Sequence, residues 1–210
     1  MAHTASRATA DAADTTTCPG LLIVLIGPSG VGKNTLMQRA IADVPGLRQM
    51  PTATSRLPRA NEQEGREHWF VSLETFGQMI ATNALFEYQE VHPGQFYGVP
   101  RAQLEQMLQV DHARLIADID IKGALNLREV FPDITRLIFI EPPSLSELEA
   151  RIRARGETSE ADLQARMARV PMELAFATKC DFRILNDDLD HASQALIGII
   201  HGEAARLGCH

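Results

Sequence analysis

Runs of apolar residues alternate along the chain with polar, glycine-containing connections, and this pattern predicts strands that alternate with helices. Six consecutive aliphatic residues at Leu21–Ile26 leave no polar face for solvent, which is typical of a parallel strand buried on both sides. After this run, Leu36, Met37, Ala40 and Ile41 recur at helical spacing. The first elements are therefore a strand, a glycine-rich turn and a helix.

The alternation continues over the rest of the chain. Further strands are predicted at 85–91, 114–121, 136–140 and 181–186, and further helices at 73–82, 100–110, 123–130, from 145 onward and 189–207. Pro171 interrupts a further helix, and we expect a kink there because proline removes a backbone hydrogen bond. The order predicts an α/β fold with a parallel central sheet and helices on both faces.

The turn after the first strand has the spacing G-x-x-x-x-G-K of a phosphate-binding loop. The candidate ATP contacts in it are Gly27, Pro28, Ser29, Gly30, Val31, Gly32, Lys33, Asn34 and Thr35. Its backbone N–H groups converge on an anion at a helix N-terminus, and Lys33 adds a cation for the outer phosphates. Asn34 stands where the pattern has the Ser or Thr that holds Mg²⁺, and Thr35 follows it directly.

Length, charge and composition narrow the classes of protein that fit. The 210 residues suffice for one α/β domain with inserted segments. The net charge is −7, so the chain does not have the excess of basic residues that is typical of nucleic-acid-binding proteins. No apolar run reaches the ~18–20 residues that are needed to cross a membrane. Residues 1–19 lack the pattern of a secretory signal, and we expect a flexible tail. Cys18, Cys180 and Cys209 have no metal-ligand spacing, which favours a reducing, cytoplasmic setting.

Two arginines three residues apart mark a second candidate phosphate site. Arginine forks bind phosphate oxygens in pairs, although a solvated charged loop is the simpler interpretation of Arg56 and Arg59 alone. The stretch resembles the guanylate kinase signature T-[ST]-R-x-x-[KR]-x-x-[DE]-x-x-G-x-x-Y-x-[FY]. The matching positions are Thr54, Ser55, Arg56, Arg59, Glu62, Gly65 and Phe70, and His68 replaces the tyrosine. With the other motifs, the resemblance extends over roughly residues 20–205.

The resemblance implies a site for GMP. The implied contacts are Thr52, Arg56, Arg59, His68, Glu87, Tyr97, Val99 and Asp120. Arg56 and Arg59 would grip the acceptor phosphate with Tyr97, and Thr52 would touch the base. On spacing alone, Glu87 is a solvent-facing strand residue, but in the family the matching carboxylate accepts from guanine N1–H and the 2-amino group.

Two of these positions depart from the family. His68 takes the place of a phosphate-binding tyrosine; its imidazole can donate, more strongly when charged, or it can be a packed strand residue. Val99 replaces a Ser or Thr that touches the base, which weakens the case for guanine.

Acidic residues lie near the carboxyl end of the strand predicted at 114–121. The segment Asp118-Ile119-Asp120-Ile121-Lys122-Gly123 resembles the family's D-[IV]-D-x-Q-G, with Lys122 in place of Gln. Two acids two apart on a strand point the same way and can hold Mg²⁺ or its water shell, although both can merely cap the strand end. By the family match, Asp118 and Thr35 would serve the metal, and Asp120 the acceptor nucleoside.

Arginines concentrate again beyond residue 150. The family has matching lid arginines at Arg151, Arg155 and Arg166, which with Lys33 would neutralise charge on the migrating phosphoryl group. Without that match, a solvated helix face balanced by acidic neighbours explains the same residues. Asn186 lies in a stretch that resembles the family's N-D-D-L-D, whose Asn lies near the adenine of ATP.

Together these features predict a P-loop three-layer sandwich with two insertions in a single domain, 20–210. We expect a core at 20–50, 100–143 and 172–210, a GMP-binding part at 51–99 and a lid at 144–171. The expected reaction is Mg²⁺-dependent transfer from ATP to GMP, without nucleic-acid or membrane partners. Two alternatives remain: a ribose 1,5-bisphosphate phosphokinase-like enzyme and a non-catalytic guanylate-kinase-like binding module. The oligomeric state is left open.

Overall fold

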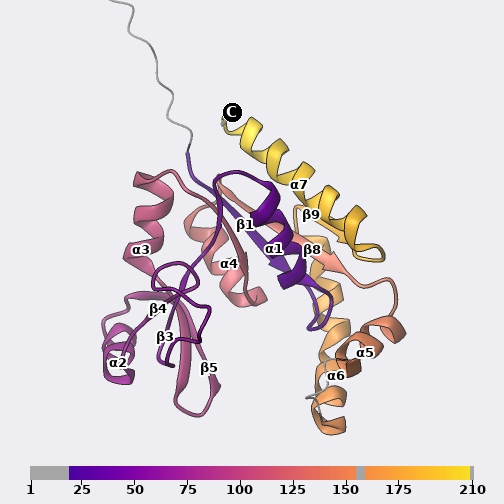
Figure 1. Ribbon diagram of the computed structural model, residues 1–210, viewed down its shortest axis with the longest axis horizontal. Helices are drawn as coiled ribbons and strands as arrows, with labels where there is room; N and C mark the ends of the chain where they lie inside the picture. Colours follow the sequence, from indigo (N-terminus) through magenta and orange to yellow (C-terminus); the bar gives the residue numbers. More distant parts are fainter. Residues whose placement is uncertain (1–18, 155–158, 209–210) are drawn as a thin grey trace, which may run out of the picture.

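The computed structural model describes residues 19–154 and 159–208. Figure 1 shows a central sheet with helices on both faces, and two smaller parts that extend from the same side of it. One part contains α2 and the second sheet, and the other contains α5 and α6. Arg155 and nearly all of the expected tail lie outside the described residues.

The central sheet is parallel throughout. Its strand order is β2 (Leu47–Gln49), β7 (Arg114–Asp118), β1 (Leu21–Ile26), β8 (Thr135–Glu141) and β9 (Phe182–Leu185). No residue of β1 is more than 2% exposed, as its uninterrupted aliphatic sequence predicts. The central position of β1 places the loop that follows it at the carboxyl edge of the sheet, where ligands of open α/β sheets bind.

Helices cover both faces of this sheet, which confirms the three-layer sandwich. The odd-numbered residues of β1 pack in one core cluster with α1 (Lys33–Asp43) and α7 (Leu189–Arg206). The even-numbered residues pack in a second cluster with α3 (Arg101–Glu105) and α4 (Ile121–Val130). The helix predicted at 100–110 consists of α3 and a π-helical turn, Gln106–Val110.

A second, smaller sheet lies beside the core. Its order is β4 (His68–Phe70), β3 (Thr52–Thr54), β6 (Gln95–Pro100) and β5 (Leu85–His92). Phe76 of α2 (Leu73–Ala81) is fully buried against Ala53 and Leu85 of this sheet. The pattern of the sequence predicted β5 and α2, but it gave no sign of the three-residue strands β3 and β4.

One detail of the connections differs from the expectations. β7 ends at Asp118, and Asp120 is the N-cap of α4 because its carboxylate accepts from the Gly123 N–H at 2.7 Å. The two acids therefore do not share a strand. In the second insertion, α5 (Leu145–Ala154) precedes α6 (Glu160–Ala175), and Pro171 lies inside α6.

None of the described helices combines the length and the apolar character that are needed to cross a membrane.

Candidate active site

The backbone of the glycine-rich loop between β1 and α1 packs closely against neighbouring residues. Gly27 and Gly32 have φ angles of 144° and 105°, a region that favours glycine. A Cβ atom at Gly27 would lie 2.4 Å from the carbonyl oxygen of Ile140, and one at Gly32 would lie 2.5 Å from Nδ2 of Asn186. Side chains at these two positions would therefore disrupt the loop.

The side chain of Lys33 folds back over this loop. Its Nζ donates to the carbonyl oxygens of Gly27 at 2.7 Å and Pro28 at 3.3 Å, and lies 3.6 Å from Oδ1 of Asp118. The ammonium group is thus held at the carboxyl edge of the central sheet, where β1 and β7 end side by side. A phosphate at the start of α1 would meet both this cation and the positive end of the helix dipole.

A cavity of about 410 Å³, here called the lid cavity, lies between the loop and α5. Thr35, Arg151 and Asn186 contribute to its lining. The amide of Asn186 is buried and donates to the carbonyl oxygen of Val31 at 2.7 Å, so it supports the loop directly. Arg151 donates to the carbonyl oxygen of Asn186 at 3.1 Å.

A second arginine from the same insertion also reaches the loop. Arg166 of α6 donates from Nη1 to Oγ of Ser29 at 3.1 Å. The guanidinium of Arg166 therefore contacts the loop itself, and that of Arg151 contacts Asn186, which supports the loop. Both are placed to neutralise a phosphate chain bound there.

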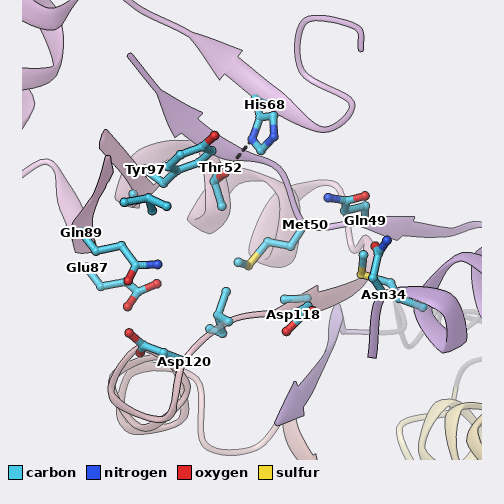
Figure 2. Close-up of a pocket in the computed structure, with 15 residues that line it drawn as sticks. Asn34, Gln49, Met50, Thr52, His68, Glu87, Gln89, Tyr97, Asp118 and Asp120 are labelled. Atoms are coloured by element: carbon cyan, nitrogen blue, oxygen red, sulfur yellow. Dashed lines mark hydrogen bonds between the residues drawn. The ribbon is translucent and has the colours of Figure 1, made fainter. Parts of the chain in front are cut away.

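A cavity of about 320 Å³, here called the β5 cavity, lies between the central sheet and the second sheet. Figure 2 shows Glu87 and Asp120 together at one end and Asn34 and Gln49 at the other. Asn34 lines this cavity whereas its neighbour Thr35 lines the lid cavity. The two cavities are therefore adjacent at the first turn of α1.

The carboxyl group of Glu87, which lines the β5 cavity, has a raised pKa. Burial, and after it the Asp120 carboxylate, raise its pKa from 4.5 to about 7 against the opposing effect of Lys122. The carboxylate lies against the start of α4, because a Cβ atom at Gly123 would come within 2.2 Å of its Oε2. Gly123 thus provides the space that Glu87 occupies. A ligand with paired N–H donors would favour the charged form of this carboxylate.

Arg56, two residues after β3, is held in a network of hydrogen bonds. Its Nη1 and Nη2 donate to the two carboxylate oxygens of Glu62 at 2.7 and 2.6 Å, and its Nε donates to the Tyr97 hydroxyl at 2.6 Å. The Arg56 side chain is only 9% exposed, and its hydrogen bonds lower the pKa of Glu62 to about 2. The guanidinium is therefore fixed in orientation, next to a hydroxyl that lines the β5 cavity.

His68 also lines the β5 cavity. Its Nδ1 and Oγ1 of Thr52 share a hydrogen bond of 2.8 Å, drawn in Figure 2, and its Nε2 lies 3.9 Å from Oε1 of Glu62. Burial lowers its pKa below the ordinary value, and Arg56 adds to the effect. The neutral imidazole is thereby favoured, so the environment does not supply the charged donor that the sequence suggested.

A family model described as guanylate kinase matches residues 20–203 of the chain. The chain belongs to the guanylate kinase family. It is 43% identical over 178 residues to the guanylate kinase of Thermosynechococcus vestitus, covering 85% of this chain and 92% of that protein. The guanylate kinase of Synechocystis sp. is 40% identical over 192 residues, covering 91% and 99%. A crystal structure of guanylate kinase from Anaplasma phagocytophilum superposes with a TM-score of 0.62 at 28% identity, covering 89% and 87% of the two chains.

In this guanylate kinase family member, the structure brings most of the candidate acceptor residues together. The side chains that line the β5 cavity include those of Thr52, His68, Glu87, Tyr97 and Asp120. Arg56 adjoins the cavity through its bond to Tyr97. Arg59 is exposed, and its backbone is held by Glu62, which accepts from the Arg59 N–H and donates its own N–H to the Arg59 carbonyl oxygen.

Three candidate residues lie elsewhere than expected. Val99 is fully buried among the apolar residues beneath the central sheet and does not line the cavity. We therefore leave it out of the proposed GMP contacts. Asn34, expected on the ATP side, lines the β5 cavity instead, and Asp118 lines this cavity while Thr35 lines the other.

Sequence reasoning also missed residues that the cavities include. These residues are Gln49 and Gln89, which line the β5 cavity. Gln89 follows Glu87 by two residues on β5, so strand alternation was a signal that could have identified it.

Proposed function

We propose that this chain transfers the terminal phosphoryl group of ATP to GMP, giving ADP and GDP. Membership of the guanylate kinase family supports the reaction. The observation that carries the assignment of residues is the adjacency of two cavities at the first turn of α1, one with the phosphate loop and one with Glu87. ATP occupies the lid cavity and GMP the β5 cavity, so that the two phosphate groups face each other across Lys33.

Glu87 selects the base. Its carboxylate accepts hydrogen bonds from N1–H and the 2-amino group of guanine, which together favour ionisation and offset its burial. Adenine presents no such pair of donors, so its binding would leave a buried carboxylate unpaired. A sugar phosphate has no base for Glu87 to read and would not need this carboxylate, which argues against the ribose 1,5-bisphosphate alternative. Asp120, beside Glu87, contributes to the nucleoside side of the site.

Arg56 and Tyr97 align the acceptor phosphate, with Arg59, Thr52 and His68 completing that end of the site. Glu62 fixes the orientation of Arg56, so that little side-chain freedom is lost on binding. No covalent intermediate is needed, because positioning and charge neutralisation account for phosphoryl transfer.

Lys33, Arg151 and Arg166 stabilise the charge that spreads over the migrating phosphoryl group. Lys33 and Arg166 already contact the glycine-rich loop, and Arg151 contacts the residue that supports it. These contacts favour an enzyme over a non-catalytic binding module, which would not need cations around the loop. We expect Arg155 to join them, although it lies outside the described residues.

Mg²⁺ accompanies ATP in kinases of this family, and the oxygen donors of this site fit such an ion. Thr35 and Asp118 are the proposed contacts on the protein, directly or through water. Mg²⁺ is commonly held by one or two carboxylates together with phosphates and water, rather than by a cage of protein ligands. In keeping with this, residues 19–154 and 159–208 contain no group of three or more His, Cys, Asp or Glu side chains able to hold a metal. Bound with ATP, the ion would neutralise phosphate charge.

Steady-state transfer assays on two variants test this assignment. Glu87→Ala should raise KM for GMP strongly and leave KM for ATP unchanged, because the residue contacts only the acceptor. Lys33→Ala should abolish transfer while circular dichroism and thermal unfolding show an intact fold. An equal loss of GMP and ATP use in Glu87→Ala would mean that the residue is structural and would contradict the proposal.

A further inference from the structure

Gln89 presents an amide to the same cavity as Glu87. The two residues are separated by one position on β5, and strand alternation directs both toward the β5 cavity, together with Val91. Tyr88 lies between them, is 51% exposed and does not line the cavity. Figure 2 shows the Gln89 amide and the Glu87 carboxylate on the same side of the cavity, above Asp120.

The amide of Gln89 is available for a ligand. Within the described part of the chain, it has no hydrogen-bond partner. Gln89 is paired in register with Tyr97 on β6, and these neighbouring strands bring it close to the residues that hold the acceptor. The side chain is exposed, so burial within the fold does not explain an amide at this position.

Other donors in the cavity are engaged or far from Glu87. The Thr52 hydroxyl is bonded to His68, and the Tyr97 hydroxyl adjoins Arg56 at the phosphate end. Asn34 and Gln49 lie at the opposite end of the cavity in Figure 2. The expected hydroxyl at position 99 is absent, because Val99 is apolar and buried in the core.

Guanine requires a donor that Glu87 cannot supply. Its N1–H and 2-amino groups are donors, but the adjacent O6 is an acceptor. An ionised carboxylate only accepts hydrogen bonds, whereas a glutamine amide carries two N–H donors. We propose that Gln89 is a second base-reading residue, whose amide donates to O6 of guanine while Glu87 accepts from N1–H and the 2-amino group. This inference rests on the proposed GMP function.

A comparison of GMP with 6-thio-GMP tests the contact. The thio analogue keeps both donors that face Glu87 but replaces O6 with sulfur, a weak acceptor. Wild type should use GMP with a kcat/KM about 3- to 10-fold above that for 6-thio-GMP, the range expected for one neutral hydrogen bond. Gln89→Ala should lower kcat/KM for GMP by about the same factor and leave that for 6-thio-GMP unchanged, so that the preference disappears.

Two further variants make the test specific. Gln89→Glu keeps the length of the side chain but removes the donor and adds a charge, so it should impair GMP use more than Gln89→Ala. Gln103→Ala is the matched control, since Gln103 is an exposed glutamine of α3 outside both cavities and should match wild type on both substrates. KM for ATP should stay constant throughout.

The failures of the two proposals are distinguishable. If wild type does not phosphorylate GMP at all, the proposed function is wrong and Gln89 has no base to read. If wild type uses GMP well but Gln89→Ala retains the full preference over 6-thio-GMP, or lowers both substrates equally, the contact with O6 is wrong and the function stands.

Discussion

Replacing Glu87 with glutamine should stabilise the ligand-free protein above neutral pH while it impairs the use of GMP. Burial and the Asp120 carboxylate raise the pKa of Glu87 from 4.5 to about 7. The folded protein therefore binds this proton more tightly than the unfolded chain does, and the free energy of unfolding decreases as the pH rises from about 4.5 through about 7. At about 1.4 kcal/mol per pH unit, the full cost is of the order of 3 kcal/mol above pH 7.

Glutamine keeps the size of the side chain and has no charge to bury. Thermal unfolding of wild type and Glu87→Gln should therefore differ little at pH 5 and clearly at pH 8. With about 2–4 °C per kcal/mol for a chain of this size, the variant should gain about 6–12 °C in Tm at pH 8. Glu129→Gln is the control, because Glu129 is an exposed acid of α4 that lines neither cavity.

The reasoning would be refuted by a Tm gain in Glu87→Gln that is the same at pH 5 and pH 8, or by destabilisation at both. Either result would mean that burial of the Glu87 charge does not determine how the free energy of unfolding depends on pH. The accompanying transfer assay should show a raised KM for GMP, since an amide N–H group facing guanine N1–H is repelled.

Three other substitutions probe neighbouring parts of the site. Arg56→Lys loses the paired bonds to Glu62 and the bond to Tyr97, so KM for GMP should rise about 10- to 100-fold in steady-state assays with KM for ATP unchanged; an unchanged KM for GMP would exclude Arg56 from the acceptor site. Gly123→Ala places a methyl group where the Glu87 carboxylate lies and should raise KM for GMP about tenfold. A wild-type KM would show that the carboxylate can move without weakening the binding of GMP. Thr35→Ala should shift the Mg²⁺ titration of transfer to several-fold higher concentrations, and full retention of the wild-type titration would argue against its role.

The sequence predicted the core of the fold because its signals there are strong and local. Six aliphatic residues in succession specify β1, and the glycine spacing after it specifies a turn that the observed φ angles of Gly27 and Gly32 require. The strands β3 and β4 were not predictable from the pattern, because three residues are too few for periodicity. Tertiary pairing makes them strands, because β3 pairs with β6 on one side and with β4 on the other.

The candidate site was predictable at the level of residue type and less so at the level of orientation. The sequence predicts that Asp120 lies on a strand, but its carboxylate caps the N-terminus of α4. Val99 matched a position expected at the base, yet the apolar side chain packs into the core, as its hydrophobicity favours. Gln89 needed both the alternation of β5 and the knowledge that this face of the strand lines a cavity, and only the tertiary structure supplies the second.

The central claim is that Glu87 and its surroundings select GMP as the acceptor. A mixture of GMP, AMP and ribose 1,5-bisphosphate at equal concentrations, incubated with Mg²⁺ and ATP, measures this directly through the rate at which each acceptor is consumed. We predict that GMP is consumed at least about 100-fold faster than either competitor. Preferential consumption of the sugar phosphate, or consumption of AMP at the rate of GMP, would contradict the claim.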